Sequence, residues 1–375
     1  MTRRRTILLA SPYGQTGGGM GSIMTYLAAA PGGPADRYIL KRIETRGGGH
    51  ILRSPLHLAR AVGHVVQEAV AGRLALVHLN LAEGGSVYRK AIIMAATKLC
   101  GGRVLLHLHA ARIRQFHDSV NGLGKWVTRW MFHTADHCIV LGEVWRNWVT
   151  GTLGVPSERV SVVHNGVPAV ADAASARAET GVFRLLFLGN LQERKGVADL
   201  LAALATPQLR SRPVQVTLAG GGAVDQYRQL ATELGVLDKV RFTGWVGQDE
   251  ARGLITQADA LILPSYDEGL PLVILEALSC GTPVICTPVG SIPEVMAHET
   301  TAWFVMPGDV TAIAEAVVRL ADDPALRQHL AQEGRGLYRR LFTMDAFARE
   351  IERFYRMLTS DKPLPPKLAL APESS

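Results

Sequence analysis

The sequence has few cysteines and no long apolar run, and both features limit the classes of protein to which it can belong. Neither a zinc site nor a redox pair fits the spacing of its four cysteines, which are Cys100, Cys138, Cys280 and Cys286. No apolar stretch approaches the roughly 18 residues that are needed to cross a bilayer. The apolar run Ile7 to Ala10 is also shorter than the core of a signal peptide and predicts a first β-strand. A reducing cytoplasm fits this composition.

Acidic residues are scarce in the first half of the chain. Residues 1–178 hold 21 Lys and Arg against 9 Asp and Glu, whereas the remainder holds 19 against 24. A basic half suits an anionic substrate, a membrane surface or nucleic acid, although a solvated basic face serves solubility equally well. Nucleic-acid binding is disfavoured, because the chain lacks a basic helix with interleaved aromatic residues.

The 375 residues, 47% of them hydrophobic, suffice for about two globular domains. Short runs of Val, Ile and Leu alternate with helical patterns, which is typical of βαβ units and a parallel sheet buried on both faces. Strands are predicted at 6–10, 38–43, 74–79, 103–109, 137–141 and 160–163, and again at 184–189, 214–219, 240–243, 260–263 and 283–286. The fold class is therefore α/β, with two Rossmann-like, doubly wound domains.

The domain boundaries follow from composition. A small, polar, Ala-rich stretch at 169–181 predicts a linker between a first domain, 1–168, and a second domain, 182–342. An apolar stripe from Phe347 to Leu358 predicts a terminal helix over 343–360. The Pro-rich end, 361–375, predicts a disordered tail.

Loops at the carboxyl ends of the strands are where ligands bind in doubly wound sheets. The first loop, SPYGQTGGGMGSIMTYL, has Gly18 and Gly19 before a helix whose start favours an anion. It does not match G-x-G-x-x-G, so a dinucleotide cofactor is disfavoured. A flexible tight turn is the alternative interpretation.

Two loops of the second half carry the charged candidates. In LLFLGNLQERKGVADLL, Gly189 and Asn190 end a strand, and Arg194 and Lys195 stand before a helix, where two cations suit a diphosphate. In PSYDEG, Glu268 stands beside the amides of Gly269 and Leu270, which can serve a phosphate, and Pro271 suits the first turn of the next helix. Glu276, inside that helix, suits the vicinal diol of a ribose. A helix cap for Glu268 and a salt bridge for Glu276 remain open.

Five segments, in this order along the chain, resemble the motifs of the family 4 glycosyltransferases. They are the Gly-rich first loop, VVHNGV, GNLQERKG, RFTGWV and the E-x7-E segment EGLPLVILEALSCGTPVI. The resemblance covers nearly the whole chain. It implies a GT-B fold, in which two domains face across a cleft and the terminal helix crosses back to the first domain. It also implies transfer of a sugar, with retention of the anomeric configuration, from a nucleoside diphosphate sugar.

The resemblance assigns roles to individual residues. Arg194 and Lys195 would hold the donor diphosphate, Glu276 the ribose, and Glu268 the transferred sugar. His109, in LLHLHAA, matches the histidine that the family has at the reaction centre, although ordinary packing is its alternative.

The glycines complete this predicted donor set. Gly18 and Gly19 would approach the diphosphate, and Gly244 of RFTGWV belongs with the residues of the donor loops. The donor base, UDP or GDP, and the sugar stay open, because these loops fit several donors.

The segment VHLNLAEGGSVYRKAI further resembles a bacterial capsule and exopolysaccharide subgroup, in which a second histidine is common where this chain has Asn80. The expected acceptor is a saccharide or a lipid-linked saccharide. A nucleotide-sugar epimerase is the runner-up activity, and a non-catalytic subunit that binds sugar nucleotides or polysaccharide is the alternative of a different class.

No D-x-D motif is present, whereas Arg194 and Lys195 can neutralise a departing diphosphate. The prediction is therefore transfer without a metal ion or a cofactor other than the donor itself.

The segment GKWVTRWMFH predicts a helical face of Trp126, Val127, Trp130 and Met131, bordered by Lys125 and Arg129. Such a face suits a membrane interface, and a core face is the alternative. We expect a cytoplasmic protein, attached peripherally to the anionic inner face of the plasma membrane.

Overall fold

The structure is a computed structural model, which describes residues 4–13, 18–47, 54–170 and 181–360. The chain divides into two compact units, an N-terminal unit of residues 1–165 with 345–375 and a C-terminal unit of residues 166–344. The predicted tail, 361–375, lies outside the described residues, as does most of the predicted linker, 169–181.

The N-terminal unit contains a six-stranded parallel sheet in the order β2-β1-β3-β4-β5-β6. Its strands are β1 (Thr6–Ser11), β2 (Ile39–Glu44), β3 (Leu74–Leu81), β4 (Arg103–Leu108), β5 (His137–Val140) and β6 (Val160–Val162). All six residues of β1 are buried, as expected for a central strand that is covered on both faces. The strand order reverses between β1 and β3, so a ligand site is expected where these two strands end.

The helical segments of this unit connect the strands. They are α1 (Gly18–Ala29), η2 (Pro34–Asp36), α2 (Ser54–Val70), α3 (Gly85–Leu99), α4 (Ile113–Ser119), α5 (Gly122–Thr134), α6 (Glu143–Asn147), η4 (Trp148–Thr152) and η5 (Ser157–Arg159).

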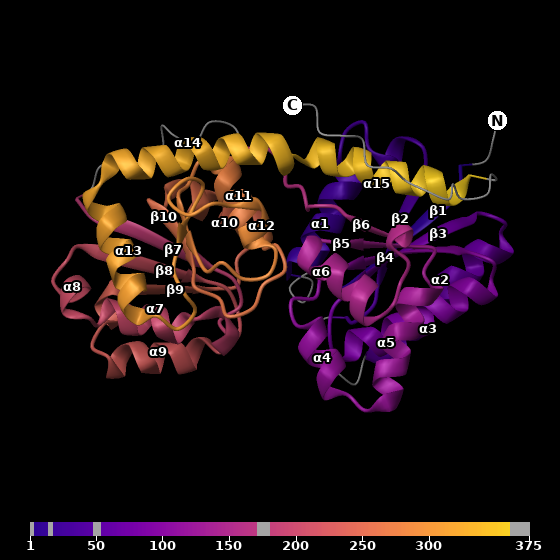
Figure 1. Cartoon of the computed structure of the whole chain (residues 1–375), viewed down its shortest axis with the longest axis horizontal. Helices are drawn as coiled ribbons and strands as arrows, with labels where there is room; N and C mark the ends of the chain where they lie inside the picture. The colour runs from indigo at the N-terminus through magenta and orange to yellow at the C-terminus, as the bar shows by residue number, and fades with distance from the viewer. Residues whose placement is uncertain (1–3, 14–17, 48–53, 171–180, 361–375) are drawn as a thin grey trace. The chain divides into compact units, whose positions relative to one another are not determined.

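The last described helix, α15 (Met344–Thr359), packs on the N-terminal unit, which is far away in sequence (Figure 1). Its stripe is buried, with Phe347, Ile351, Phe354, Tyr355 and Leu358 at most 3% exposed. Rings from α15 contact the histidines of β3, β4 and β5. The predicted return of the terminal helix to the first domain is thus confirmed.

The C-terminal unit contains a second six-stranded parallel sheet, in the order β12-β11-β10-β7-β8-β9. Its strands are β7 (Phe183–Leu188), β8 (Val214–Ala219), β9 (Val240–Gly244), β10 (Ala260–Leu263), β11 (Val284–Cys286) and β12 (Trp303–Phe304). The strand order reverses between β7 and β10, which is the expected ligand edge of this unit.

The connecting helical segments include two long helices near the end of the unit. They are η7 (Glu193–Lys195), α7 (Val197–Leu204), α8 (Pro207–Arg210), α9 (Val224–Glu233), η8 (Leu237–Lys239), α10 (Gln248–Gln257), α11 (Leu272–Cys280), α12 (Ile292–Val295), α13 (Val310–Asp322) and α14 (Pro324–Leu341).

The predicted fold class is confirmed, because every predicted strand is present with ends that differ by at most two residues. The two-residue strand β12 was not predicted, since it is too short to show a pattern. Pro271 is the N-cap of α11 and accepts from the N–H of Ile274, so it lies at the start of the first turn.

The predicted Trp126 face on α5 is divided between surface and core. Trp126 is 60% exposed and stacks on Trp130 at 6.3 Å between ring centroids, whereas Met131 is fully buried. Met131 therefore belongs to the core, and the exposed part of the predicted face is the tryptophan pair with Lys125 and Arg129. In the described part of the chain, no helix is both long enough and apolar enough to span a bilayer.

Candidate functional site

The charged candidates of the C-terminal unit lie together where β7 and β10 end. The turn after β7 runs through η7 to Gly196, which has φ +67° and caps α7. A Cβ at Gly196 would lie 2.1 Å from the carbonyl oxygen of Pro264, which follows β10. Glycine thus allows the two loops to touch, and this contact brings the predicted cations to the predicted acid.

Lys195 and Glu268 form an ion pair, with 2.5 Å between Nζ and Oε1. The side chains are only 12% and 7% exposed, so the pair is largely withdrawn from solvent. The hydroxyl of Ser265 also donates to Oε1 of Glu268, at 2.7 Å. The side chain of Glu268 is therefore held by a cation and a hydroxyl rather than by the end of a helix, which argues against the cap interpretation.

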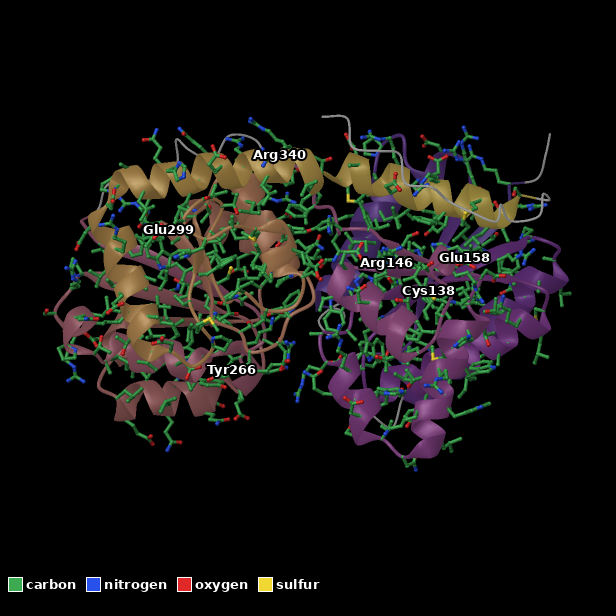
Figure 2. All side chains as sticks on the ribbon, viewed as in Figure 1. Cys138, Arg146, Glu158, Tyr266, Glu299 and Arg340 are labelled. Atoms are coloured by element: carbon green, nitrogen blue, oxygen red, sulfur yellow. The ribbon has the colours of Figure 1, made fainter. Side chains whose placement is uncertain are left out.

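Arg194 lies against the same loop. Its guanidinium donates to the carbonyl oxygen of Asp267 at 3.0 Å, and its own carbonyl accepts from the backbone N–H of Tyr266 at 2.8 Å. Tyr266, labelled in Figure 2, donates its hydroxyl to Asp199 on α7 at 2.9 Å. The two loops are thus cross-linked on both sides of the cation pair.

The amides predicted to serve a phosphate follow Glu268, the partner of Lys195, in the loop after β10. Within the described residues, the N–H groups of Gly269 and Leu270 make no hydrogen bond in the protein. Two cations on the turn after β7 and two amide donors on the adjoining loop after β10 can together bind an anion such as a phosphate.

Gly290 was not predicted from the sequence, although it contacts this loop closely. It has φ +61°, and a Cβ there would lie 1.9 Å from the carbonyl oxygen of Glu268. The next residue, Ser291, donates its N–H to the carbonyl of Gly269 at 2.9 Å. A glycine after a predicted strand end, in TPVGSIPE, was the available signal.

The glycines of the loop after β8, 220–222, were also not predicted from the sequence. Gly189 donates to the carbonyl of Ala219, and Leu191 donates to the carbonyl of Gly221, so the loops after β7 and β8 interlock. The predicted residues Gly189 and Asn190 therefore lie beside the unpredicted run Gly220–Gly222. Gly244, at the end of β9, accepts from the N–H of Gly220 and is brought to the same edge.

Glu276 lies in the second turn of α11. The residues of this helix are buried except Glu276, which is partly exposed. A partly exposed carboxylate on an otherwise buried helix can contact a polar ligand without leaving a core position.

The N-terminal unit places His109 just after β4, beside two other histidines. His109 Nε2 lies 2.8 Å from Asn80 Oδ1, and its ring centroid lies 4.0 Å from that of His107. His107 Nδ1 lies 3.2 Å from His78 Nε2, and His78 Nδ1 lies 2.7 Å from the hydroxyl of Tyr355 on α15. The predicted residue thus ends a column of buried polar side chains.

Burial keeps these histidines neutral. Loss of solvent lowers the pKa of both His78 and His109 to about 3, and it lowers the pKa of His107 well below its ordinary value. At neutral pH, His109 is therefore an uncharged imidazole that can form hydrogen bonds.

Gly18 and Gly19 are the first two residues of α1, and both are exposed. They belong to the N-terminal unit with His109, whereas the cations and both glutamates belong to the C-terminal unit. The predicted site residues are thus divided between the two units.

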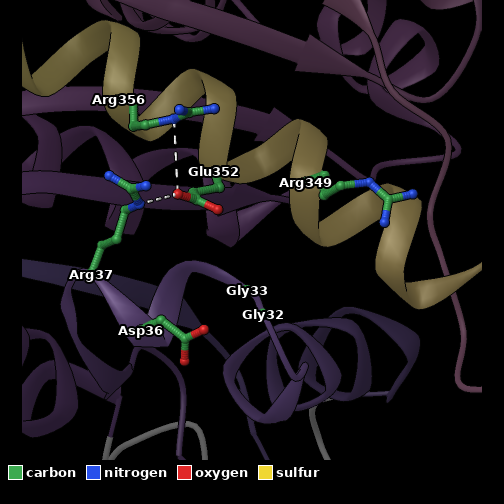
Figure 3. A pocket seen from close by; sticks show the side chains of 7 residues that line it. All are labelled: Gly32, Gly33, Asp36, Arg37, Arg349, Glu352 and Arg356. Atoms are coloured by element: carbon green, nitrogen blue, oxygen red, sulfur yellow. Dashed lines mark ion pairs between the residues drawn. The ribbon is translucent and has the colours of Figure 1, made fainter.

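A hollow of about 570 Å³ on the N-terminal unit is separate from these residues. It lies between η2 and α15, where Glu352 pairs with Arg37 at 2.8 Å and with Arg356 at 3.8 Å (Figure 3). None of the predicted site residues lines it.

Among the described residues, no group of three or more His, Cys, Asp or Glu side chains is placed to hold a metal ion.

Two family models match the chain in succession. "Glycosyltransferase Family 4" matches residues 23–170, and "Glycosyl transferases group 1" matches residues 171–337. Together they cover residues 23–337, most of both units.

Curated relatives and solved structures agree with these matches. A glycogen synthase of Mycobacterium tuberculosis is 34% identical over 56% of this chain, and an alpha-D-kanosaminyltransferase of Streptomyces kanamyceticus is 25% identical over 82% of it and 80% of the relative. The chain spans about half of the length of the glycogen synthase, 51%.

Among solved structures, a sucrose-phosphate synthase from Thermosynechococcus elongatus has a TM-score of 0.75 at 23% identity and covers 95% of this chain and 99% of its own. Anabaena HepE in complex with UDP-glucose has a TM-score of 0.72 at 18% identity and covers 93% and 99%. These two structures share the fold of this chain.

Proposed function

The chain belongs to glycosyltransferase family 4, and from this premise we propose that it transfers a sugar from a nucleoside diphosphate sugar to a saccharide or lipid-linked saccharide acceptor. The observation that carries the proposal is the cluster of Arg194, Lys195 and Glu268 where β7 and β10 end, with the unbonded amides of Gly269 and Leu270 beside it. The same edge is the general ligand edge of a doubly wound sheet.

In the proposed mechanism, the cations stabilise the charge that develops on the departing diphosphate. Arg194 and Lys195 are already held in place by Asp267 and Glu268, so little reorganisation is needed when the donor binds. Glu276 would hold the ribose, and Glu268 would face the transferred sugar. The acceptor would attack from the face that the diphosphate leaves, which retains the anomeric configuration.

Metal independence is part of the proposal. Two fixed cations supply the positive charge that a metal ion would otherwise bring to the leaving group. Transfer that is unaffected by a chelator would support it, and transfer that requires added Mg²⁺ or Mn²⁺ would contradict it.

The nature of the donor is the first thing to measure. We expect one UDP- or GDP-sugar of a panel to raise the melting temperature, because a ligand that binds only the folded state stabilises it by mass action. HepE, which shares the fold, is described in complex with UDP-glucose, so UDP-glucose is the first donor to try. Donor turnover without any acceptor would favour an epimerase instead.

Variants of the two cations test the mechanism. Arg194→Ala and Lys195→Met should each reduce kcat/KM by about a hundredfold or more, as expected for a preorganised group that stabilises transition-state charge. Arg319→Ala is the matched control, because Arg319 is a 60% exposed cation of the same unit, on α13. Turnover that is unchanged in both site variants would refute the assignment of the diphosphate.

A further inference from the structure

Asn80 joins the three strands around the point where the order of the N-terminal sheet reverses. It lies on β3 and is fully buried. Its Nδ2 points to the carbonyl oxygen of Ala10 on β1 at 3.5 Å, and its Oδ1 lies 2.8 Å from Nε2 of His109, after β4. A single side-chain amide thus contacts both neighbouring strands.

These two contacts determine which nitrogen of His109 carries the proton. A backbone carbonyl can only accept, so the NH₂ group of Asn80 faces Ala10 and its oxygen faces His109. The amide oxygen is also only an acceptor, so Nε2 of His109 has to be the donor. In a neutral imidazole, the other nitrogen, Nδ1, is then a bare acceptor.

In the part of the chain that the structure describes, no other side chain forms a hydrogen bond with Nδ1 of His109. The rings of His107 and His109 are in contact, but His107 bonds to His78 through Nδ1, and its buried Nε2 has no hydrogen-bond partner. Among the described residues, Nδ1 of His109 has no partner in the protein and is not one of the fully buried unpartnered atoms, and the residue as a whole is half-buried. The free acceptor of His109 is therefore available to a ligand.

We propose that Asn80 is a positioning residue, which holds His109 in the Nε2–H tautomer so that Nδ1 accepts a hydrogen bond from a hydroxyl of the bound sugar. The part of the proposal that concerns the sugar rests on the proposed function. The tautomer itself rests only on the contacts of Asn80.

Nitrogen NMR of the full chain, labelled with ¹⁵N-histidine, tests the tautomer directly, and the signal of His109 is assigned with His109→Gln. At neutral pH we expect Nε2 to show the shift of a protonated nitrogen and Nδ1 the shift of a bare one. Asn80→Ala should give a mixture of the two tautomers and lower kcat/KM by roughly tenfold, the effect of one lost hydrogen bond. A protonated Nδ1 in the wild type would overturn the proposal.

Asn80→Asp preserves the shape of Asn80 and serves if the alanine variant does not fold. A carboxylate at 80 accepts from Nε2 and stabilises the imidazolium, so the pKa of His109 should rise from about 3 towards its ordinary range. The other titratable groups that face His109 are His107, His78 and, beyond them, Tyr355. An unchanged pKa of His109 in this variant would contradict the contact.

Ser161→Ala is the matched control. It removes the hydroxyl that lies 2.9 Å from Nε2 of His137, another buried histidine of the same unit. The tautomer of His109 should not change in it, and a change there would mean that the effect of Asn80 variants is not local.

The contact with the sugar is tested separately, with UDP-glucose and GDP-mannose as probes. Binding of a donor should shift the Nδ1 signal of His109. If a donor stabilises the protein but does not shift the Nδ1 signal, the proposed hydrogen bond between Nδ1 of His109 and a sugar hydroxyl is wrong. If neither probe, nor any donor of the wider panel, binds or reacts, the proposed function fails, whereas the tautomer is still decided by the spectrum of the free protein.

Discussion

Glu68 is a buried carboxylate that accepts hydrogen bonds from three residues. It lies on α2 and is 1% exposed, and its oxygens accept from Arg73 at 2.9 Å, Lys41 at 2.7 Å and Thr6 at 2.9 Å. The bond from Arg73, with the contributions of Lys41 and Thr6, lowers the pKa of Glu68 to about 2 against the opposing effect of burial. This cluster links α2 with β1 and β2 at the end of the sheet opposite the site.

The lowered pKa of Glu68 has a consequence for stability. Its folded pKa is below the unfolded one, so the native state is stabilised above about pH 4.5 and loses this contribution as the pH falls towards 2. Glu68→Gln should reduce the free energy of unfolding by about 3 kcal/mol at pH 7, because buried Thr6 and the partly exposed Arg73 and Lys41 lose their charged acceptor. The difference from the wild type should shrink between pH 4.5 and pH 2.

Urea denaturation at several pH values measures this effect. Glu350→Gln is the control, because Glu350 pairs with Arg353 on the surface of α15 with side chains 48% and 40% exposed. An exposed pair of this kind contributes about 0–1 kcal/mol. Equal losses in the two variants would show that the buried cluster has no special role.

The loops after β7 and β10 meet where the strand order of the C-terminal sheet reverses, and they carry the residues proposed to bind the donor. The loop after β10 carries Glu268, and the turn before α12 packs on it through Gly290, where a side chain would overlap the carbonyl of Glu268. The shape of the acidic loop therefore depends on a residue that carries no chemistry of its own. A side chain at position 290 would therefore displace Glu268, and with it the ion pair with Lys195.

Gly290→Ala should move the loop that carries Glu268 and weaken donor binding. Both Gly290 and Gly235 have positive φ, +61° and +67°, but a Cβ at Gly235 would meet nothing within 4 Å. Gly235→Ala thus costs only the backbone strain, on the order of 1 kcal/mol, which both variants share.

The comparison is made with the thermal shift produced by the donor. We expect the shift to be largely lost in Gly290→Ala and preserved in Gly235→Ala. A donor response that is equal in the two variants would show that the packing of Gly290 is unimportant for the site.

The N-terminal unit is built from two distant parts of the chain. Residues from 345 onward belong to it, although the whole C-terminal unit lies between them and residue 165. Tyr355 on α15 bonds to His78, which in turn bonds to His107 beside His109. The end of the chain therefore contributes to the surroundings of the candidate site as well as to the core.

An anionic membrane surface is one partner that suits the charge of the chain. Residues 1–178 have the excess of basic residues, and Trp126, Trp130, Lys125 and Arg129 stand together on α5. We propose peripheral attachment to an anionic cytoplasmic leaflet, where amphipathic rings lie at the headgroup level and cations pair with lipid charge.

Vesicle flotation tests this attachment. The wild type should float with vesicles that contain phosphatidylglycerol and less with neutral vesicles, and the double variant Trp126→Ser/Trp130→Ser should float less. Trp245→Ser is the control, because Trp245 is a 51% exposed tryptophan of the other unit. Flotation that does not depend on lipid charge would remove the proposal.

The sequence alone determined the class of the fold, and it named the residues that are candidates for the site. Apolar runs predicted all the strands but β12, because a strand that is covered on both faces needs a continuous apolar segment. Arg194, Lys195 and Glu268 were identified because charged residues next to predicted strand ends stand out against an apolar background.

Only the tertiary structure decided which groups meet. Lys195 and Glu268 are 73 residues apart, and Asn80 and His109 are 29 apart, so their pairing depends on strand order, which local patterns do not encode. The division of the Trp126 face and the role of Gly290 likewise depend on what packs against them. Local sequence determines what each segment can form, whereas packing between distant segments determines the partners of each side chain.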